Sequence, residues 1–436
     1  MPSNTGGDGR GMEIFETMES AVRSYSRAFP VVFTTSAGSL MEDEDGKQYV
    51  DFFSGAGALN YGHNPAAMKR AMIEYLEGDG VLHSLDLATE AKGRFLERFA
   101  EVILRPRGME YRVQFPGPTG TNAVEAALKL ARKATGRQMV ACFANGYHGM
   151  TLGALAVTGN AAKRRGAGVN LSNAFPLPFD GDLGKGVDTL DYLEQLLDNP
   201  GSGMDLPAAV ILETVQAEGG VKVAGGAWLR RLERIVRAHG ILLIVDDIQV
   251  GCGRTGRFFS FEDAGIKPDI VCLSKSISGA GLPMALVLIR PDLDVWDPGE
   301  HNGTFRGNNL AFVTATEALS YWEDEALTVE VARKAARITT RLGEMAKRFP
   351  AARAHVRGRG LIQGLFCATP GLAEEVSAEA FSRGLVVETA GPGDEVIKIL
   401  PALTIPDLLL ERGLDVIEES LAAVLAPAVG ELAAVA

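Results

Sequence analysis

Residues 241–247 read ILLIVDD and residues 270–275 read IVCLSK, and these two stretches decide the predicted fold. Each is a short run that is apolar at every position and then ends in ionisable side chains. Continuously apolar strands, as opposed to alternating ones, are typical of a sheet that helices cover on both faces. Helical patterns such as residues 121–135 and 228–239 lie between such runs. The sequence therefore predicts an α/β domain with a mainly parallel sheet.

Four other apolar runs extend this sheet, at residues 112–115, 139–143, 208–212 and 285–289. In an open α/β sheet, ligands bind beyond the carboxyl ends of the strands. Five of the predicted strands are followed by polar, ionisable or glycine-rich segments: residues 116–122 (PGPTGTN), residues 145–149 (NGYHG), Glu213, residues 246–249 (DDIQ) and Lys275. One polar strand end is common at a protein surface, but five together predict a binding site at this edge.

The chain is long enough for two lobes, because its 436 residues exceed the roughly 250–300 at which a single core stops growing. We expect residues 64–308 to form the large domain and residues 309–436 a smaller α+β domain. Residues 1–63 are expected to pack with the small domain, and within them residues 12–29 predict one amphipathic helix that ends at Pro30. In the small domain we expect strands at residues 360–366, 386–388 and 396–400.

The composition limits the partners and the compartment. A formal net charge of −12 argues against nucleic acid and anionic membrane surfaces as partners. No apolar stretch reaches the roughly 18–20 residues that span a bilayer, and the first residues lack the pattern of a signal peptide. The four cysteines form no CxxC pair, and Cys142 and Cys272 lie in apolar runs where packing is the expected role. We expect a cytoplasmic protein with no membrane, nucleic-acid or metal partner.

The glycine-rich loop at residues 117–122 suits an anion. Glycine lets the backbone approach a ligand closely, Thr119 and Thr121 offer hydroxyl groups, and the helix that begins near Thr121 directs unpaired N–H groups outward. The loop is not a Walker A motif, because the pattern GxxxxGK[ST] is missing. The alternative is a well-capped helix start that binds nothing.

The segment GCGRTG at residues 251–256 matches the dinucleotide-binding pattern GxGxxG, but its surroundings do not. Residues 246–250 separate it from the preceding strand, and the aromatic-rich segment RFFSFED follows it instead of a helix. The next strand ends in Ser274 and Lys275, where a dinucleotide site would place an acidic residue for the ribose. We therefore do not expect dinucleotide binding.

Lys275 is the most informative residue of the predicted edge. It follows a buried strand and precedes the small-residue loop SISGAGLP at residues 276–283. A lysine in partly apolar surroundings has a lowered pKa and attacks carbonyl groups, although a lysine in a loop is often only a solvated charge. Asp246 would stabilise a pyridinium nitrogen by about 4 kcal/mol at about 4 Å and an effective dielectric constant near 20. Such a lysine and carboxylate suit pyridoxal 5′-phosphate (PLP).

Three motifs of the chain resemble the class III (ω-amino acid) aminotransferases of PLP fold type I: DDIQVGCGRTG (246–256), LSKSISGAGLP (273–283) and NGTFRGNN (302–309). The agreement continues through DFFSGAGALNYGH (51–63), PTGTNAVEAALKLAR (118–132), NGYHGMT (145–151), ETVQAEGG (213–220) and ILPALTI (399–405), and so covers nearly the whole chain. The resemblance implies a large domain with a mainly parallel sheet, a smaller α+β domain, and PLP as cofactor.

The resemblance also implies roles for side chains around the cofactor ring. Lys275 binds PLP covalently and carries the proton that moves during transfer. Asp246 pairs with the pyridine nitrogen, Gln249 reaches the phenolic oxygen, and Tyr147 stacks on the ring. His148, which follows Tyr147, either joins this set or only packs and forms hydrogen bonds.

The cofactor phosphate has its own expected residues. The resemblance assigns its binding to Gly120 and Thr121 of one subunit and to Thr304 of the partner subunit. A contact that crosses subunits requires a homodimer, with the sites at its interface.

Within this family, the resemblance is strongest to members that pass the amino group of L-glutamate to L-aspartate 4-semialdehyde, which gives L-2,4-diaminobutyrate and 2-oxoglutarate. Relatives that act on γ-aminobutyrate have arginine where this chain has Met150, and the family usually has a carboxylate-binding arginine where this chain has Lys398. The resemblance implies substrate contacts at Glu213, Glu218 and Lys398. We expect Glu218 and Lys398 to form a switchable pair, in which Lys398 is released to hold the carboxylate of glutamate.

Three other functions remain open at this stage. The first is another class III transamination, of ornithine, γ-aminobutyrate or a related ω-amine. The second is a mutase that acts on an amino-aldehyde and needs no 2-oxoglutarate, and the third is a PLP-fold protein kept for structure or regulation. The pathway is open as well: ectoine synthesis is the expected one, and siderophore or peptide-antibiotic synthesis is the alternative.

Overall fold

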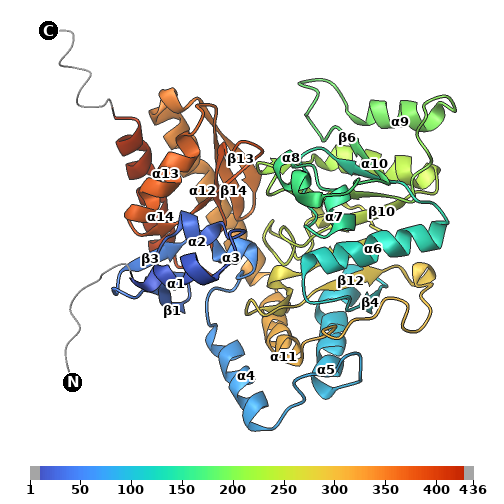
Figure 1. The fold of residues 1–436 in the computed structure, drawn as a ribbon, viewed down its shortest axis with the longest axis horizontal. Coiled ribbons are helices and arrows are strands. Elements are labelled where there is room, and N and C mark those ends of the chain that lie inside the picture. The colour runs from blue at the N-terminus through green and yellow to red at the C-terminus, as the bar shows by residue number, and fades with distance from the viewer. Residues whose placement is uncertain (1–9, 427–436) are drawn as a thin grey trace.

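A seven-stranded sheet forms the centre of the larger lobe in the computed structural model, which describes residues 10–426 (Figure 1). The strand order is β4-β12-β11-β10-β7-β5-β6; β12 runs antiparallel to β11 and β4, and the other pairs are parallel. The strands are β4 (Arg112–Gln114), β5 (Val140–Phe143), β6 (Ala174–Leu177), β7 (Ala209–Leu212), β10 (Leu242–Asp246), β11 (Ile270–Leu273) and β12 (Leu286–Ile289). The predicted mainly parallel sheet is confirmed.

Helices cover both faces of this sheet. On β10, Val245 lies in the core cluster that contains Trp228 of α10 (Gly226–Ala238), whereas Ile244 lies in a second cluster with α6 (Gly120–Thr135). Because successive side chains of a strand point to opposite faces, the two clusters lie on opposite sides of the sheet. Burial on both faces explains why the strand is apolar at every position.

The smaller lobe is built around an antiparallel sheet with the strand order β13-β14-β17-β16. Its strands are β13 (Ala354–Arg359), β14 (Ile362–Cys367), β16 (Glu388–Ala390) and β17 (Val396–Ile399). Its long helices are α12 (Ala326–Arg348), α13 (Leu372–Ser382) and α14 (Asp407–Val424). α12 contacts β13 and β14, and α13 contacts β16 and β17, so helices cover this sheet too.

N-terminal strands pair with a C-terminal strand in a third sheet. β1 (Phe33–Ala37), β2 (Leu40–Asp43) and β3 (Gln48–Asp51) are antiparallel neighbours, and β3 pairs in parallel with β15 (Leu385–Val386). Figure 1 accordingly shows the blue N-terminal elements beside the red C-terminal helices. Residues 1–9 and 427–436, which fall in the predicted N-terminal segment and small domain, lie outside the described residues.

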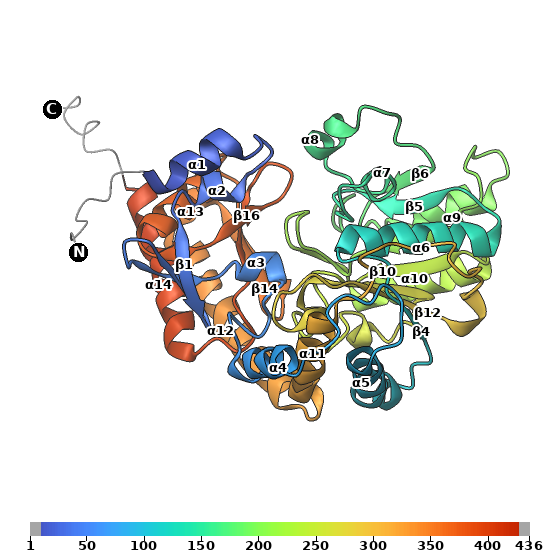
Figure 2. The ribbon, with the colours of Figure 1, turned by 60° about the horizontal axis from the view of Figure 1, so that its bottom comes forward.

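The limits of the large domain, residues 64 and 308, remain a proposal. Immediately after that limit, α11 (Asn309–Ala318) contacts α4 (Ala66–Glu77) and α5 (Glu90–Phe99), and Figure 2 shows the three helices close together. Among residues 10–426, no helix combines the length and the apolar character needed to cross a membrane.

The structure corrects two predictions of local structure. The single helix predicted at residues 12–29 is wrong, because α1 (Arg10–Met18) and α2 (Tyr25–Ala28) are separate. Between them, the hydroxyl of Ser20 accepts a hydrogen bond from the backbone N–H of Val22, and such side-chain bonds compete with helix formation. The single strand predicted at residues 386–388 is also wrong, because β15 and β16 belong to different sheets.

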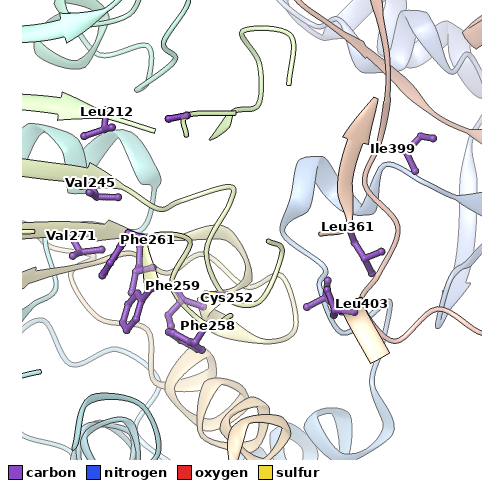
Figure 3. Close-up of a cluster of buried hydrophobic side chains, with 14 of the residues drawn as sticks. Leu212, Val245, Cys252, Phe258, Phe259, Phe261, Val271, Leu361, Ile399 and Leu403 are labelled. Carbon is purple, nitrogen blue, oxygen red and sulfur yellow. The ribbon is translucent and has the colours of Figure 1, made fainter. Parts of the chain in front are cut away.

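One buried cluster joins the two lobes (Figure 3). It contains Leu212 and Val245 from the large sheet, Phe258 from the loop after β10, and Leu361 and Leu403 from the smaller lobe. An apolar cluster that spans both lobes fixes their relative position, because separating them would expose it to water.

Arg254, in the same loop as Phe258, is fully buried and ties three parts of the chain together. Its guanidinium donates hydrogen bonds to the carbonyl oxygens of Leu361 and Pro401 and to the side-chain oxygen of Asn60. We predict that Arg254→Met lowers the free energy of unfolding by about 3 kcal/mol or more, because buried acceptors lose their donors. Arg257→Met, at a more exposed arginine of the same loop, changes it by less than about 1 kcal/mol. Denaturant unfolding measures both, and equal losses would contradict the assignment.

Candidate active site

A cavity of about 310 Å³ lies at the carboxyl edge of the large sheet. Its walls come from the segments that follow β4, β5, β7, β10 and β11: Thr119, Gly120, Thr121, Tyr147, His148, Gly149, Met150, Glu213, Asp246, Ile248, Gln249 and Lys275. Of the ten residues to which the family resemblance assigned a role in catalysis, cofactor binding or substrate binding, seven line the cavity, whereas Glu218, Lys398 and Thr304 do not. The edge that the sequence predicts therefore contains a real cavity.

Lys275 begins a short 3₁₀ turn directly after β11. Its backbone φ is 51°, in the left-handed region, which costs a residue with a side chain about 1–2 kcal/mol. The neighbouring serines hold this conformation: Ser274 donates a hydrogen bond to the carbonyl oxygen of Met284 and Ser276 to that of Gly57, both at 2.7 Å. Burial lowers the pKa of the Lys275 ammonium, and the carboxylate of Glu218 offsets part of that fall. A lysine of this kind supplies more of the neutral, nucleophilic amine.

Asp246 and His148 form a buried pair in the wall of the cavity. Oδ2 of Asp246 lies 2.7 Å from Nδ1 of His148, and both side chains are almost completely buried. Burial disfavours the imidazolium, but the hydrogen bond and the charge of Asp246 outweigh burial and raise the pKa of His148. His148, whose role the sequence left open, is thus the hydrogen-bond partner of Asp246, and this carboxylate favours its imidazolium form.

Glu213 contacts the backbone of the Tyr147 loop. Its Oε2 accepts a hydrogen bond of 2.9 Å from the backbone N–H of Tyr147. Burial raises the pKa of Glu213 to about 7, against the lowering effect of the charge on His148. The ring of Tyr147 has the ammonium of Lys163 4.7 Å from its centre, a cation–π contact. Glu213 therefore orients Tyr147, and its predicted substrate contact remains a prediction.

The end of the cavity at which the sequence predicts an anion is the N-terminus of α6, which begins at Gly120. Thr151 donates a 2.5 Å hydrogen bond to the carboxylate of Glu125, so its oxygen must accept the hydroxyl hydrogen of Thr121, at 2.7 Å. Thr119 likewise donates its hydroxyl hydrogen to Asn122. The donors left for an anion are the backbone N–H groups of Gly120 and Thr121, because those of Asn122 and Ala123 donate to the carbonyl oxygen of Thr119.

A second group of charges lies outside the cavity wall. Nζ of Lys398, on β17, is 2.6 Å from Oε1 of Glu218 and 2.9 Å from Oε1 of Glu388, and Lys398 has no exposed surface. Burial opposes ionisation of Glu218, but the charges of Lys398 and Lys275 hold its pKa at about 2. The sequence pattern did not identify Glu388; the pairing of β16 with β17, which sets it opposite Lys398, is the feature that reveals it.

Gln249 connects the cavity with this second group. Its side-chain amide donates hydrogen bonds to Glu218 (3.1 Å) and to the carbonyl oxygen of Ala56 (2.8 Å), so both of its N–H groups have acceptors. Its predicted contact with a phenolic oxygen remains a prediction. Thr304 is exposed and does not line this cavity, and its predicted contact across a subunit interface likewise remains a prediction.

Comparison with known proteins finds aminotransferases both by sequence and by structure. Residues 21–421 match the family model described as aminotransferase class III. The chain is 58% identical over 412 residues to the diaminobutyrate–2-oxoglutarate transaminase of Halalkalibacterium halodurans (94% of this chain, 96% of the relative). It is 59% identical over 413 residues to the protein of that name from Bordetella parapertussis (94% and 95%). A solved ornithine aminotransferase of Toxoplasma gondii, described with partial occupancy of PLP at its active site, is similar with a TM-score of 0.82 at 27% identity (94% and 93%).

The His148–Asp246 pair generates a prediction that nuclear magnetic resonance can test. With six histidines in the chain, ¹⁵N-histidine labelling gives few signals, and a His148→Asn variant assigns the one of interest. We predict a pKa for His148 above the ordinary value of about 6.5. In Asp246→Asn it falls below that value, because burial still opposes the charge while the carboxylate is gone. An unchanged titration in Asp246→Asn would contradict the pairing.

Proposed function

The chain belongs to the class III aminotransferases, and on that premise we propose that it transfers the amino group of L-glutamate to L-aspartate 4-semialdehyde, giving L-2,4-diaminobutyrate and 2-oxoglutarate. Two relatives of nearly the same length, at 58% and 59% identity, carry the corresponding name, which supports the substrate. The observation that carries the reaction type is the cavity in which the amine of Lys275, the Asp246–His148 pair and the N-terminus of α6 meet.

The cofactor of this family, PLP, fits the residues of the cavity. Lys275 supplies the amine for its aldehyde, Asp246 a carboxylate for its ring nitrogen, and the first turn of α6 an anion site for its phosphate. A Cβ at Gly120 would lie 3.0 Å from the side chain of Ile248, so the glycine keeps this cradle open. When bound, PLP withdraws electrons from the amine-bearing carbon of the substrate, which lets that carbon lose a proton.

The protein side chains then have separate tasks. Once the amine of the substrate has replaced that of Lys275 on the cofactor, the freed Nζ atom of Lys275, with its lowered pKa, would take the proton from the amine-bearing carbon and return it to the former aldehyde carbon. One carboxylate oxygen of Asp246, Oδ2, is bonded to Nδ1 of His148. This bond fixes the orientation of the carboxylate, so that its negative charge would face the ring nitrogen of the cofactor. The donor leaves as 2-oxoglutarate before the acceptor binds, because both half-reactions use the same lysine and the same cavity.

Substrate carboxylates are assigned to the second group of charges. We propose that Glu218 moves away from Lys398 when glutamate binds, so that the ammonium holds the carboxylate of that substrate. The ion pair of 2.6 Å between them supports a cation that is neutralised when no such carboxylate is present. Lysine offers a point charge in place of the two-pronged contact of arginine.

We also propose a homodimer, in which Thr304 reaches the phosphate site of the partner. Thr304 and its neighbour Phe305 are exposed, and so are Ile73, Leu76 and Val81. Large apolar side chains that are exposed together favour an interface.

We place the protein in the cytoplasm, because its four buried free thiols suit a reducing compartment. We propose that its product enters ectoine synthesis.

Ornithine is the second candidate substrate, favoured by the similarity to a solved ornithine aminotransferase. We place it second because that identity is 27%, against 58% for the diaminobutyrate enzyme. Met150, at the cavity wall, stands where relatives that act on γ-aminobutyrate have arginine, which counts against γ-aminobutyrate as the substrate.

A coupled assay tests the proposed reaction. We predict that 2-oxoglutarate is consumed faster with L-2,4-diaminobutyrate than with ornithine or γ-aminobutyrate, and that Lys275→Ala lowers the rate on the order of a thousandfold or more. The variant Lys347→Ala, which removes an exposed lysine of α12, serves as a lysine control and retains most of the activity. A faster reaction with ornithine would keep the reaction type and overturn the substrate.

Subunit mixing tests the role of Thr304. A dimer that combines one Lys275→Ala chain with one Thr304→Ala chain has one intact site only if Thr304 acts across the interface. We therefore predict that the mixed dimer, isolated with two different affinity tags, regains about half of the wild-type activity. Activity no higher than that of the Thr304→Ala dimer would contradict the contact.

A further inference from the structure

Lys398 has two carboxylate neighbours, where the sequence predicted one. The two come from different lobes: Glu218 follows β8 (Val215–Gln216) in the larger lobe, and Glu388 begins β16 in the smaller lobe. Their Oε1 atoms are 2.6 and 2.9 Å from Nζ of Lys398. We call Glu218, Lys398 and Glu388 the carboxylate–lysine cluster.

The two carboxylates are held differently. Glu388 stands directly opposite Lys398 in the antiparallel pair of β16 and β17, and its side chain is 8% exposed. Glu218 lies in the turn between β8 and β9 (Lys222–Val223), and its side chain is 21% exposed. Oε1 of Glu388 accepts no well-directed hydrogen bond from the described residues, although it is close to Nζ. Because it lies in a turn and is the more exposed of the two, Glu218 is the carboxylate that can leave, whereas the strand pairing keeps Glu388 beside Lys398.

The cluster carries one positive and two negative charges when both glutamates are ionised, and a buried net charge is unfavourable unless a partner compensates it. With Glu388 ionised, Lys398 remains neutralised even after Glu218 departs, so a substrate carboxylate is bound weakly. With Glu388 neutral, the departure of Glu218 leaves a full positive charge. The protonation state of Glu388 thus decides whether the carboxylate–lysine cluster favours a cationic or an anionic substrate.

We propose that Glu388 is a positioning residue that acts through Lys398 and determines specificity, favouring the cationic diamino acid over glutamate. This inference rests on the proposed function, because it takes diaminobutyrate and glutamate as the two amino substrates. At neutral pH diaminobutyrate carries two ammonium groups and one carboxylate, whereas glutamate carries one ammonium group and two carboxylates. The carboxylate of Glu388 therefore attracts the second ammonium group of diaminobutyrate and lowers the affinity of the site for the second carboxylate of glutamate.

The dependence on pH follows from the groups around Glu388. Those that face it are Lys398 on β17, Glu218, Lys275 and Tyr25 of α2. Burial raises the pKa of Glu388 to about 7, and the charge of Lys398 opposes that rise. Glu388 therefore becomes more ionised as the pH rises through 7, and the preference for the diamino acid is expected to rise with it.

Glu388→Gln in the holoenzyme tests the proposal. Each half-reaction is followed separately in single-turnover mixing, through the absorbance of the bound cofactor, with L-2,4-diaminobutyrate or L-glutamate. We expect the ratio of the two kcat/KM values, diaminobutyrate over glutamate, to fall about tenfold, equivalent to about 1.4 kcal/mol. In the wild type this ratio rises between pH 6 and 8, roughly one unit either side of the pKa, and in Glu388→Gln that part of the rise is lost.

Two further variants separate specificity from structure. Glu374→Gln removes one negative charge from an exposed position of α13 in the same lobe and is expected to leave the ratio unchanged. Glu388→Asp keeps the charge and is expected to restore part of the preference, and its folding is checked by thermal unfolding. A parallel fall of both half-reactions, or an unchanged ratio with an unchanged pH profile, would overturn the proposal.

The same measurements distinguish a failure of the proposed substrate from a failure of the inference about Glu388. If the wild type did not use diaminobutyrate at all, the substrate assignment would be wrong. Glutamate alone would then decide the inference: Glu388→Gln must remove the rise of KM for glutamate with pH, and a KM that responds to pH as in the wild type would overturn it.

Discussion

Parallel pairing of β7, β10 and β11 is the constraint on which the site depends. The register aligns Val245 with Leu212 and Asp246 with Cys272, so Glu213, Asp246 and Lys275 emerge side by side where their strands end. A slip of one residue would turn each strand's side chains to the opposite face of the sheet. Burial of both faces prevents such a slip, and the apolar strands thereby position the polar residues of the cavity.

The carboxylate–lysine cluster depends on a different constraint, the contact of the turn between β8 and β9 with the smaller lobe. The backbone oxygen of Glu218 accepts a hydrogen bond from Gly391 (3.0 Å), and that of Gly220 accepts one from Arg357 (3.1 Å). The cavity that holds the amine of Lys275 therefore belongs to the larger lobe, whereas the cluster spans both lobes, with Glu218 from the larger and Lys398 and Glu388 from the smaller. Substitutions in the cluster could therefore alter the substrate preference of a class III aminotransferase and leave the cavity that contains Lys275 unchanged.

Local patterns predicted the parallel sheet and the residues at its edge, because an apolar strand and the polar residue after it are neighbours in the sequence. Glu388 was not predicted, since its importance comes from the pairing of β16 with β17, and residues 386–388 read as one strand. The direction of the Thr121 hydroxyl was also not predicted, because its acceptor, Thr151, lies thirty residues further along the chain. β6 was also missed, because Pro176 interrupts its pattern at the edge of the sheet.

Borohydride reduction of the holoenzyme, followed by mass spectrometry of its peptides, tests most directly whether the cavity at the sheet edge performs the transfer. Reduction fixes the cofactor to the amine that holds it. The predicted result is a modified Lys275 peptide that is no longer found when L-2,4-diaminobutyrate is added before reduction. Modification of another lysine, such as Lys398, or an adduct at Lys275 that diaminobutyrate leaves unchanged, would contradict this account of the site.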